Sequence, residues 1–351
     1  RDLKGEKGAV IALVGDGSFN NGLIYEALNS LKILNTRILI VLNDNGMSIS
    51  ETVGSMAAVL KEMRAGAEDA GAVEESPNAA RRERGETAIP EDDVRLFEHF
   101  GLTYMGVVNG HDMGELLASL ERAKHVLERG SVLLHVHTRK GYGHAFAERA
   151  PTETHGVGAG GGAEYSRALG EELTALAKKD SRIVAVTAAM TDSLGLRGFF
   201  EAFPERAFDV GICEEHAAVL SASLAAAGMR PYYAIYSTFL QRAYDEIVHD
   251  VCAQNLPVVF CIDRAGVTGR DGETHQGVFD LSYLSPIPNL TIAVPKNISE
   301  FRAMLSMSVH MDGPLAIRYP REGSEGAELP ENAIEIGKFE VLHSTMSDIV
   351  L

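Results

Sequence analysis

Several features that define common functional classes are missing from this sequence. Its 351 residues include only three cysteines, Cys213, Cys252 and Cys261, and their spacing is not that of a metal site. We therefore expect small buried thiols in a reducing compartment, the cytoplasm. No apolar run is long enough to cross a membrane. The start, RDLKGEKGAV, is not a signal peptide and lacks Met, so we expect the chain to begin inside a longer protein.

Positive charge is also scarce. The chain has 32 Lys and Arg against 49 Asp and Glu, which gives a net charge of −17. Such acidity argues against nucleic acid or an anionic membrane surface as a partner, although a local basic pocket could still bind a phosphorylated substrate. A hydrophobic content of 45% is sufficient for large buried cores, and the length predicts two domains or slightly more.

The most informative stretch runs from Gly15 to Met47. An apolar run at residues 9–14 (AVIALV) predicts a buried parallel strand that ends at a Gly-Asp-Gly turn. A helical pattern follows, and a second predicted strand at 37–42 ends at Asn-Asp-Asn. Ligands of open α/β sheets bind where such strands end. The glycines do not match GxGxxG, which argues against a dinucleotide site.

The residue types of this stretch suit a diphosphate held through Mg²⁺, which needs hard oxygen ligands. Asp16 offers a carboxylate, Asn45 a side-chain carbonyl and Met47 a main-chain carbonyl. Gly15 and Gly17 allow the main chain to approach the phosphates, and the following helix start favours negative charge. Gly-Asp-Gly alone usually marks only a turn. Together with the second strand end, the pattern resembles the diphosphate motif of thiamine-diphosphate enzymes.

The chain as a whole predicts an α/β fold with two parallel-sheet domains. We expect a diphosphate-binding and Mg²⁺-binding domain at 1–155, with a mobile loop at 66–93 that has few large apolar groups. A Gly-rich linker at 156–163 leads to a second domain at 164–323. Residues 324–351 would form a polar connector and the start of a strand, which by resemblance to thiamine-diphosphate enzymes would be the stub of a third α/β domain. In the second domain we expect a helix at 164–179 and strands at 182–187, 208–213, 230–236, 257–263, 290–294 and 315–319.

Polar residues follow the predicted strands of the second domain. Glu214 and Glu215 start a helix, where either carboxylate could face a pocket or simply interact with the helix dipole. Phe239 could stack on a ring or belong to the core. Arg242 could bind substrate or form a surface ion pair.

A glycine-rich loop follows the strand at 257–263 and carries Arg264, Asp271 and His275. Histidine titrates near neutrality and is suited to proton transfer at a carbonyl oxygen. A single His in a loop is usually only solvated, but one beside an acid, an arginine and several glycines is a candidate for catalysis. Arg318, at the end of a later strand, could clamp a phosphate.

These stretches resemble the 1-deoxy-D-xylulose-5-phosphate synthase family of transketolase-like thiamine-diphosphate enzymes. The matching segments are GDGSFNNGLIYEALN, LNDNGMSIS, GHD, FDVGICEEHA, AIYSTFLQRAYDEIVHDV, IDRAGVTGRDGETHQGVFDLSYL and IRYPR. The resemblance implies two domains that bind thiamine diphosphate and Mg²⁺, a homodimer, and pyruvate and D-glyceraldehyde 3-phosphate as substrates.

The resemblance also implies a role for each matching residue. By this resemblance, Asp16, Asn45 and the Met47 carbonyl bind the metal, Lys140 lies near the diphosphate, Ile49 bends the coenzyme, and Glu214 and Phe239 contact its pyrimidine ring. The substrate phosphate is bound by Tyr236, Arg264 and Arg318. The reacting groups are contacted by Arg242, Asp271 and His275, and His155 lies near the reacting carbon.

The implied reaction is the decarboxylative condensation of the two substrates to 1-deoxy-D-xylulose 5-phosphate and CO₂. Two alternatives remain at this point. The chain could bind the coenzyme without activity, because the family begins well before the equivalent of Arg1 and has a complete third domain. It could also be another transketolase-type enzyme that takes a ketose donor instead of pyruvate.

Overall fold

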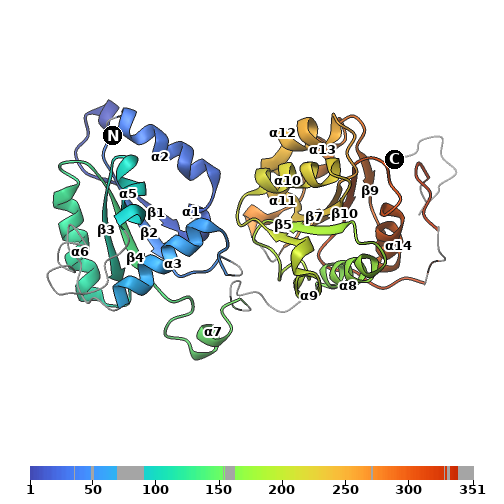
Figure 1. The fold of residues 1–351 in the computed structure, drawn as a ribbon, viewed down its shortest axis with the longest axis horizontal. Helices are drawn as coiled ribbons and strands as arrows, with labels where there is room; N and C mark the ends of the chain where they lie inside the picture. The colour runs from blue at the N-terminus through green and yellow to red at the C-terminus, as the bar shows by residue number, and fades with distance from the viewer. Residues whose placement is uncertain are drawn as a thin grey trace. The chain divides into compact units, whose positions relative to one another are not determined.

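The structure is a computed structural model that describes residues 1–34, 36–48, 51–68, 91–152, 154, 163–269, 272–327, 329 and 333–338. The chain divides into two compact units (Figure 1). The first contains residues 1–159 together with 186–193 and 208–217, and the second contains the remainder. Each unit is centred on its own sheet, so the prediction of an α/β fold with two parallel-sheet domains is confirmed. Among the described residues no helix is long and apolar enough to cross a membrane.

The first unit contains a parallel four-stranded sheet in the order β1-β2-β4-β3. Its elements are β1 (Val10–Gly15), α1 (Asp16–Phe19), α2 (Gly22–Leu34), β2 (Ile38–Asp44), α3 (Ser55–Glu68), α5 (Glu91–His99), β3 (Leu102–Asn109), α6 (Met113–Val126), β4 (Ser131–His137) and α7 (Ala145–Arg149). The ends of the expected loop at 66–93 are therefore helical, and residues 69–90 lie outside the described part of the chain.

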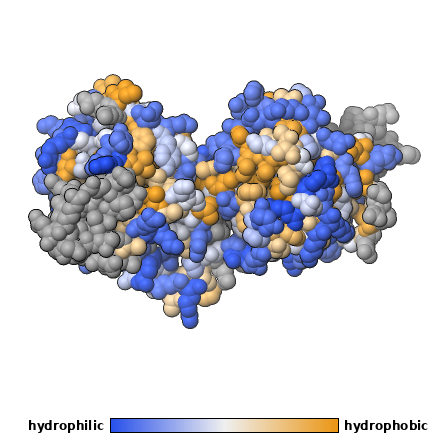
Figure 2. Space-filling model, viewed as in Figure 1, coloured by the Kyte–Doolittle hydropathy of each residue, from blue (hydrophilic) through white to orange (hydrophobic). Residues whose placement is uncertain are grey.

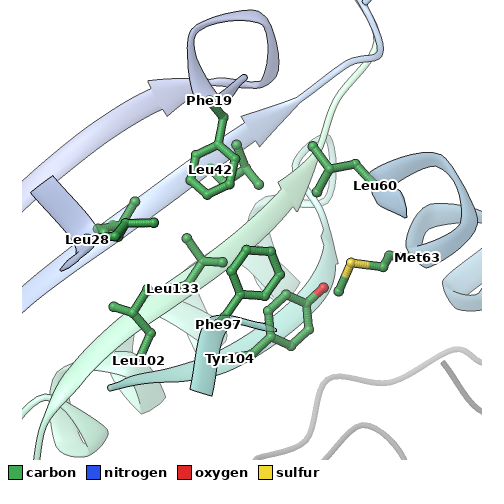
Figure 3. Close-up of a cluster of buried hydrophobic side chains, with 10 residues drawn as sticks. Phe19, Leu28, Leu42, Leu60, Met63, Phe97, Leu102, Tyr104 and Leu133 are labelled. Carbon is green, nitrogen blue, oxygen red and sulfur yellow. The ribbon is translucent and has the colours of Figure 1, made fainter. Parts of the chain in front are cut away.

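The two faces of this sheet pack against different helices, as expected from the alternation of side chains along a strand. Leu133 of β4 belongs to a core with residues of α1, α2, α3 and α5, whereas Val132 and Leu134 pack with α6. Figure 3 shows the first of these cores, in which the rings of Phe97 and Tyr104 are stacked with their centroids 5.7 Å apart. This core supports the end of β2, where polar residues begin.

β1 is the part of the sheet that departs from expectation. The strand lies where the sequence predicts it, but it is not buried, because it is an edge strand whose Ile11 and Leu13 are 60% and 74% exposed. Figure 2 shows that hydrophobic residues interrupt the hydrophilic surface on the face in view.

The second sheet has six strands in the order β6-β5-β7-β8-β10-β9, and its pairs β7–β8, β8–β10 and β10–β9 are parallel. Its strands are β5 (Ile183–Thr187), β6 (Ala207–Asp209), β7 (Arg230–Tyr236), β8 (Val259–Asp263), β9 (Thr291–Ala293) and β10 (Leu315–Arg318). The helices are α8 (Glu164–Lys179), α9 (Arg197–Ala202), α10 (Glu214–Ala226), α11 (Ser237–Leu240), α12 (Tyr244–Glu246), α13 (Asp280–Leu284) and α14 (Ile298–Ser308). The predicted helix at 164–179 is confirmed.

The strand predicted at 208–213 is wrong in its extent, because β6 ends at Asp209. The Asp209 carboxylate accepts hydrogen bonds from the main-chain nitrogens of Ala189 and Gly211, at 2.8 and 3.0 Å, and turns the chain. Gly211 has φ of +73°, a conformation that glycine adopts easily and that ends an extended strand. This turn leads to the start of α10.

Candidate functional site

The carboxyl ends of β1 and β2 bring the two halves of the predicted diphosphate motif to one edge of the first sheet. The strands pair in register from Val10 to Gly15, and Gly15 lies opposite Asn43. Asp16 is the first residue of α1, and Gly15 is its N-cap. Asn45 and Met47 follow directly after β2. A side chain added at Gly17 would lie 2.9 Å from the Cβ of Ser48, so glycine is required where these segments meet.

A cavity of about 490 Å³ opens at this edge. Its lining includes Asp16, Asn45 and Met47, the three residues predicted to bind a metal. The other lining residues are Asp44, Gly46, Glu51, Thr52, Gly54, Ala57, Ala58, Leu60, Lys61 and Arg64. The structure therefore brings the predicted metal ligands together around one space.

The donor set of this cavity fits Mg²⁺. Carboxylate, amide and main-chain oxygens are hard ligands, and together they place one formal negative charge in the set. Asp16 is 2% exposed, and burial raises the pKa of its carboxyl, while a 2.7 Å hydrogen bond from Thr52 opposes that rise. A cation would offset the cost of this buried charge. Within the described residues, three or more His, Cys, Asp or Glu nowhere gather into a metal site.

Lys140 lies at the same edge of the sheet. Its Nζ donates a 2.5 Å hydrogen bond to the main-chain oxygen of Ser48. Burial lowers the pKa of Lys140, and the negative charge of Asp16 opposes that change. The Lys140 ammonium group and the Asp16 carboxylate therefore influence each other electrostatically.

The side chains beneath this edge of the sheet are not among those predicted from the sequence. Asp44 is fully buried, and its carboxylate contacts Nη1 of Arg64 and lies 2.9 Å from Nε2 of His135. Burial raises the pKa of Asp44, but His135 and Arg64 outweigh it, and the net effect lowers the pKa. The signal in the sequence was His135, which lies between the apolar residues Leu134 and Val136.

Four predicted substrate and coenzyme residues form a cluster at the carboxyl edge of the second sheet. The rings of Tyr236 and Phe239 are stacked at 5.8 Å, and His275 lies edge-on to Phe239 at 5.2 Å. The guanidinium carbon of Arg264 lies 4.1 Å from the centre of the Tyr236 ring. Phe239 and His275 are partly exposed, so both can meet a ligand.

Buried hydrogen-bond partners fix the position of the Arg264 side chain. It is 4% exposed, and its Nη1 donates to Asp263 at 3.1 Å and to Ser166 at 3.2 Å. Burial raises the pKa of Asp263, and the adjacent guanidinium opposes that rise. Arg264 has φ of +55°, which is uncommon for a residue with a side chain. The main chain turns sharply here and directs the guanidinium back over Tyr236.

Arg318 ends β10 and donates from Nε to Asp280 at 2.8 Å. Its side chain is 15% exposed. Arg242 is exposed, in agreement with either a substrate contact or a surface ion pair. Both arginines belong to the second unit.

The two adjacent glutamates at the start of α10 differ in burial. Glu214 is 2% exposed, whereas Glu215 is partly exposed. A carboxyl that shares a proton with a coenzyme ring needs a dry environment, so the structure favours Glu214 over its neighbour. Ile49, His155 and Asp271 lie outside the described residues.

Two family profiles match the chain. Residues 1–138 match 1-deoxy-D-xylulose-5-phosphate synthase, and residues 162–325 match the transketolase pyrimidine-binding domain. The 1-deoxy-D-xylulose-5-phosphate synthase of Clostridium perfringens strain SM101 is 44% identical over 362 residues, which cover 96% of this chain and 58% of the relative. That of Desulforudis audaxviator is 45% identical, covering 97% and 58%.

Two solved transketolases are also similar. The transketolase of Campylobacter jejuni aligns with a TM-score of 0.43 at 17% identity, covering 91% of this chain and 57% of that chain. A split-gene transketolase, described as an inactive beta4 tetramer, aligns with a TM-score of 0.44 at 29% identity, covering 50% of this chain and 57% of that chain.

The fold has two parallel sheets, and a cavity lined by oxygen ligands lies at the carboxyl edge of the first. Residues 162–325, which contain most of the second sheet, match a pyrimidine-binding domain. Together these features define the fold as transketolase-like. The sequence matches narrow this class further. Over 96–97% of its length the chain is similar to 1-deoxy-D-xylulose-5-phosphate synthases, and it spans about 58% of the length of these curated relatives.

Proposed function

We propose that the first unit binds Mg²⁺ and the diphosphate of thiamine diphosphate. The observation that carries this proposal is the cavity at the end of β2, where Asp16, Asn45 and Met47 offer three hard oxygens. Gly15 and Gly17 would give the phosphates access to the main chain, and Lys140 would supply positive charge. Ile49 would press on the coenzyme and bend it.

We propose that Glu214 acts on the pyrimidine ring of the same coenzyme. Its buried carboxyl would hold a proton at a ring nitrogen. Phe239, already part of an aromatic cluster, would stack on the ring. The match of residues 162–325 to a pyrimidine-binding domain supports this assignment.

The reaction that fits these groups is the condensation of pyruvate with D-glyceraldehyde 3-phosphate to give 1-deoxy-D-xylulose 5-phosphate and CO₂. Thiamine diphosphate, when bound, supplies the nucleophilic carbon and accepts the electron pair released with CO₂. Arg242, His155 and Asp271 would orient the pyruvate-derived group and the acceptor hydroxyl.

The second substrate brings a phosphate and an aldehyde. Arg264 and Arg318 would bind its phosphate, together with the hydroxyl of Tyr236, because a guanidinium matches phosphate geometry. His275 would deliver a proton to the aldehyde oxygen as the new bond forms. These cationic side chains would offset the net charge of −17, which otherwise repels a dianionic substrate.

The direct test supplies the chain with Mg²⁺, thiamine diphosphate and carboxyl-labelled pyruvate. We expect labelled CO₂ that depends on glyceraldehyde 3-phosphate, and no turnover of xylulose 5-phosphate. Coenzyme binding without CO₂ release would favour the inactive alternative, and turnover of xylulose 5-phosphate would favour another ketol transfer. Calorimetric titration with the coenzyme separates the binding result from the activity result.

A substitution tests the assignment of the acid. We expect Glu214→Ala to reduce product formation at least about 100-fold, which is the range of a lost general acid–base group. Glu215→Ala, at the adjacent and more exposed position, is the matched control and should retain most activity. Unchanged circular dichroism would show that the fold is intact. Near-normal turnover by Glu214→Ala would remove this residue from the mechanism.

We further propose that the protein is a cytoplasmic homodimer, as the family resemblance suggests. Sedimentation equilibrium of the purified chain tests the dimer, for which a mass twice 37.8 kDa is expected.

A further inference from the structure

A connected set of buried side chains lies directly beneath the loop that carries Asn45 and Met47. Asp44 ends β2, and both oxygens of its carboxylate have partners. Oδ1 contacts Nη1 of Arg64 and accepts a 3.1 Å hydrogen bond from the main-chain nitrogen of Gly46. Oδ2 lies 2.9 Å from Nε2 of His135. The carboxylate thus joins α3, β4 and the loop itself.

The chain of contacts continues through the imidazole ring. Nδ1 of His135 lies 2.8 Å from the hydroxyl oxygen of Tyr104. His135 and Tyr104 are 0% and 2% exposed, so solvent cannot replace either contact. An ionised carboxylate only accepts hydrogen bonds, so Nε2 donates to Asp44, and the Tyr104 hydroxyl occupies the other ring nitrogen.

Other contacts tie the same loop to the end of β4. The main-chain nitrogen of Thr138 donates to the Asp44 carbonyl at 2.9 Å, and its hydroxyl donates to Asn43 at 2.7 Å. Met47 donates from its main-chain nitrogen to the Asn45 side chain at 3.0 Å. These contacts hold the loop from β2 and from the end of β4. The Asp44 side chain contacts both the loop backbone, at Gly46, and the buried His135.

We propose that Asp44, His135 and Tyr104, with Arg64, are positioning residues that preset the Asn45–Met47 loop for a divalent cation. The inference rests on the proposed Mg²⁺ and thiamine-diphosphate site. None of the four is a proposed metal ligand; they act through the geometry of the loop. Outer contacts that orient ligands typically change metal affinity about 10- to 100-fold when they are removed.

The first test measures Mg²⁺ affinity by calorimetry at saturating thiamine diphosphate. We expect His135→Phe to weaken Mg²⁺ binding about 10- to 100-fold, and His135→Gln, whose amide can still donate to Asp44, to recover part of the loss. Tyr104→Phe removes only the outer hydroxyl and should have a smaller effect. It also serves if His135→Phe fails to fold.

Leu133→Ala is the matched control. Leu133 is fully buried on β4, two residues before His135 and in the core that contains Tyr104, but its apolar side chain cannot form a hydrogen bond with Asp44. Its truncation should lower the thermal midpoint of the protein without changing Mg²⁺ affinity. Equal loss of Mg²⁺ affinity in Leu133→Ala and His135→Phe would reduce the set to a general packing role and overturn the inference.

A second readout needs neither metal nor coenzyme. Hydrogen–deuterium exchange of peptides that contain residues 43–48 should be faster in His135→Phe than in the wild type, and unchanged in Leu133→Ala. Unchanged exchange in His135→Phe would show that the inference is wrong. Failure of the wild type to bind thiamine diphosphate with Mg²⁺ would instead overturn the proposed function, so the two failures are distinguishable.

Discussion

Asp44 and Asp263 occupy corresponding places in the two sheets. Asp44 ends β2, which lies between β1 and β4, and Asp263 ends β8, which lies between β7 and β10. Both carboxylates are 0% exposed, and both contact an arginine. A buried acid at the end of a central strand is therefore common to the two sheets.

The partners of the two acids differ, and with them the effect on each pKa. Asp44 contacts His135 and Arg64, which come from separate elements, and its pKa is lowered despite burial. Asp263 contacts the next residue, Arg264, and Ser166 of α8, and burial raises its pKa. The first acid organises a backbone loop, while the second holds one side chain in place. Burial at a strand end alone does not determine what a carboxylate does there.

Among the substitutions of these acids, we expect Asp263→Ala to reduce the free energy of unfolding the most. The side chain of Arg264 is 5% exposed, so removing the Asp263 carboxylate takes a close counter-charge away from a buried guanidinium. We expect a loss of about 3–5 kcal/mol in the free energy of unfolding. Urea denaturation of the variant and the wild type measures it.

The double variant Asp263→Ala/Arg264→Met separates charge from packing. Replacing both members of a buried pair by apolar groups is often close to neutral, so it should recover most of the loss. A double variant as unstable as Asp263→Ala would contradict the charge argument. It would point instead to the packing around Ser166.

Asp44→Asn should cost less at neutral pH, about 2–3 kcal/mol, which is the range of lost hydrogen bonds to a charged group. The Arg64 side chain is 15% exposed and can partly rehydrate. Because the folded pKa of Asp44 lies below 3.8, its stabilisation is present above the unfolded pKa and is lost as pH falls through the folded pKa. The difference between wild type and variant should therefore shrink on acidification.

Urea titrations in EDTA at pH 7 and at several values below pH 4 measure this difference. EDTA keeps any divalent cation from adding to the stability of either protein. If the stability difference between wild type and Asp44→Asn grows as pH falls, the folded pKa of Asp44 is raised. Asp44 and Asp263 would then have pKa values shifted in the same direction.

Much of the fold and part of the candidate site could be predicted because the signals are local. The periodicity of residues 164–179 predicts α8, which the structure confirms. The order strand, Gly-Asp-Gly, helix, strand, Asn-Asp-Asn places Asp16 and Asn45 at one sheet edge, and both line one cavity. Their spacing in sequence and the geometry of a parallel sheet are sufficient for this conclusion.

The rest depends on contacts that sequence patterns do not encode. His135 and Arg64 lie 91 and 20 residues from Asp44, so no local pattern connects them. The apolar run of β1 predicts burial, but an edge strand is buried only if other elements cover it. The premature end of β6 depends on the tertiary contact between Asp209 and Ala189.

A third aspartate, Asp180, tests whether the loss of stability on substitution depends on burial of the carboxylate or only on its ion pair with an arginine. Asp180 follows α8 and pairs with Arg182 at 2.7 Å, but their side chains are 18% and 53% exposed. The hydrogen bond from Arg182 lowers the pKa of Asp180, so its contribution is present above the unfolded value near 3.8 and lost as pH falls through the folded pKa.

We expect Asp180→Asn to cost only about 0.5 kcal/mol at pH 7, because exposed ion pairs gain little in water and the amide keeps an acceptor for Arg182. High salt should reduce even this difference, since it screens exposed charges more than buried ones. Urea denaturation at low and high salt measures both effects. A loss as large as that of Asp44→Asn would show that pairing with arginine, whatever its depth, determines the stability that an aspartate contributes here, and the contrast between strand-end acids and surface acids would no longer hold.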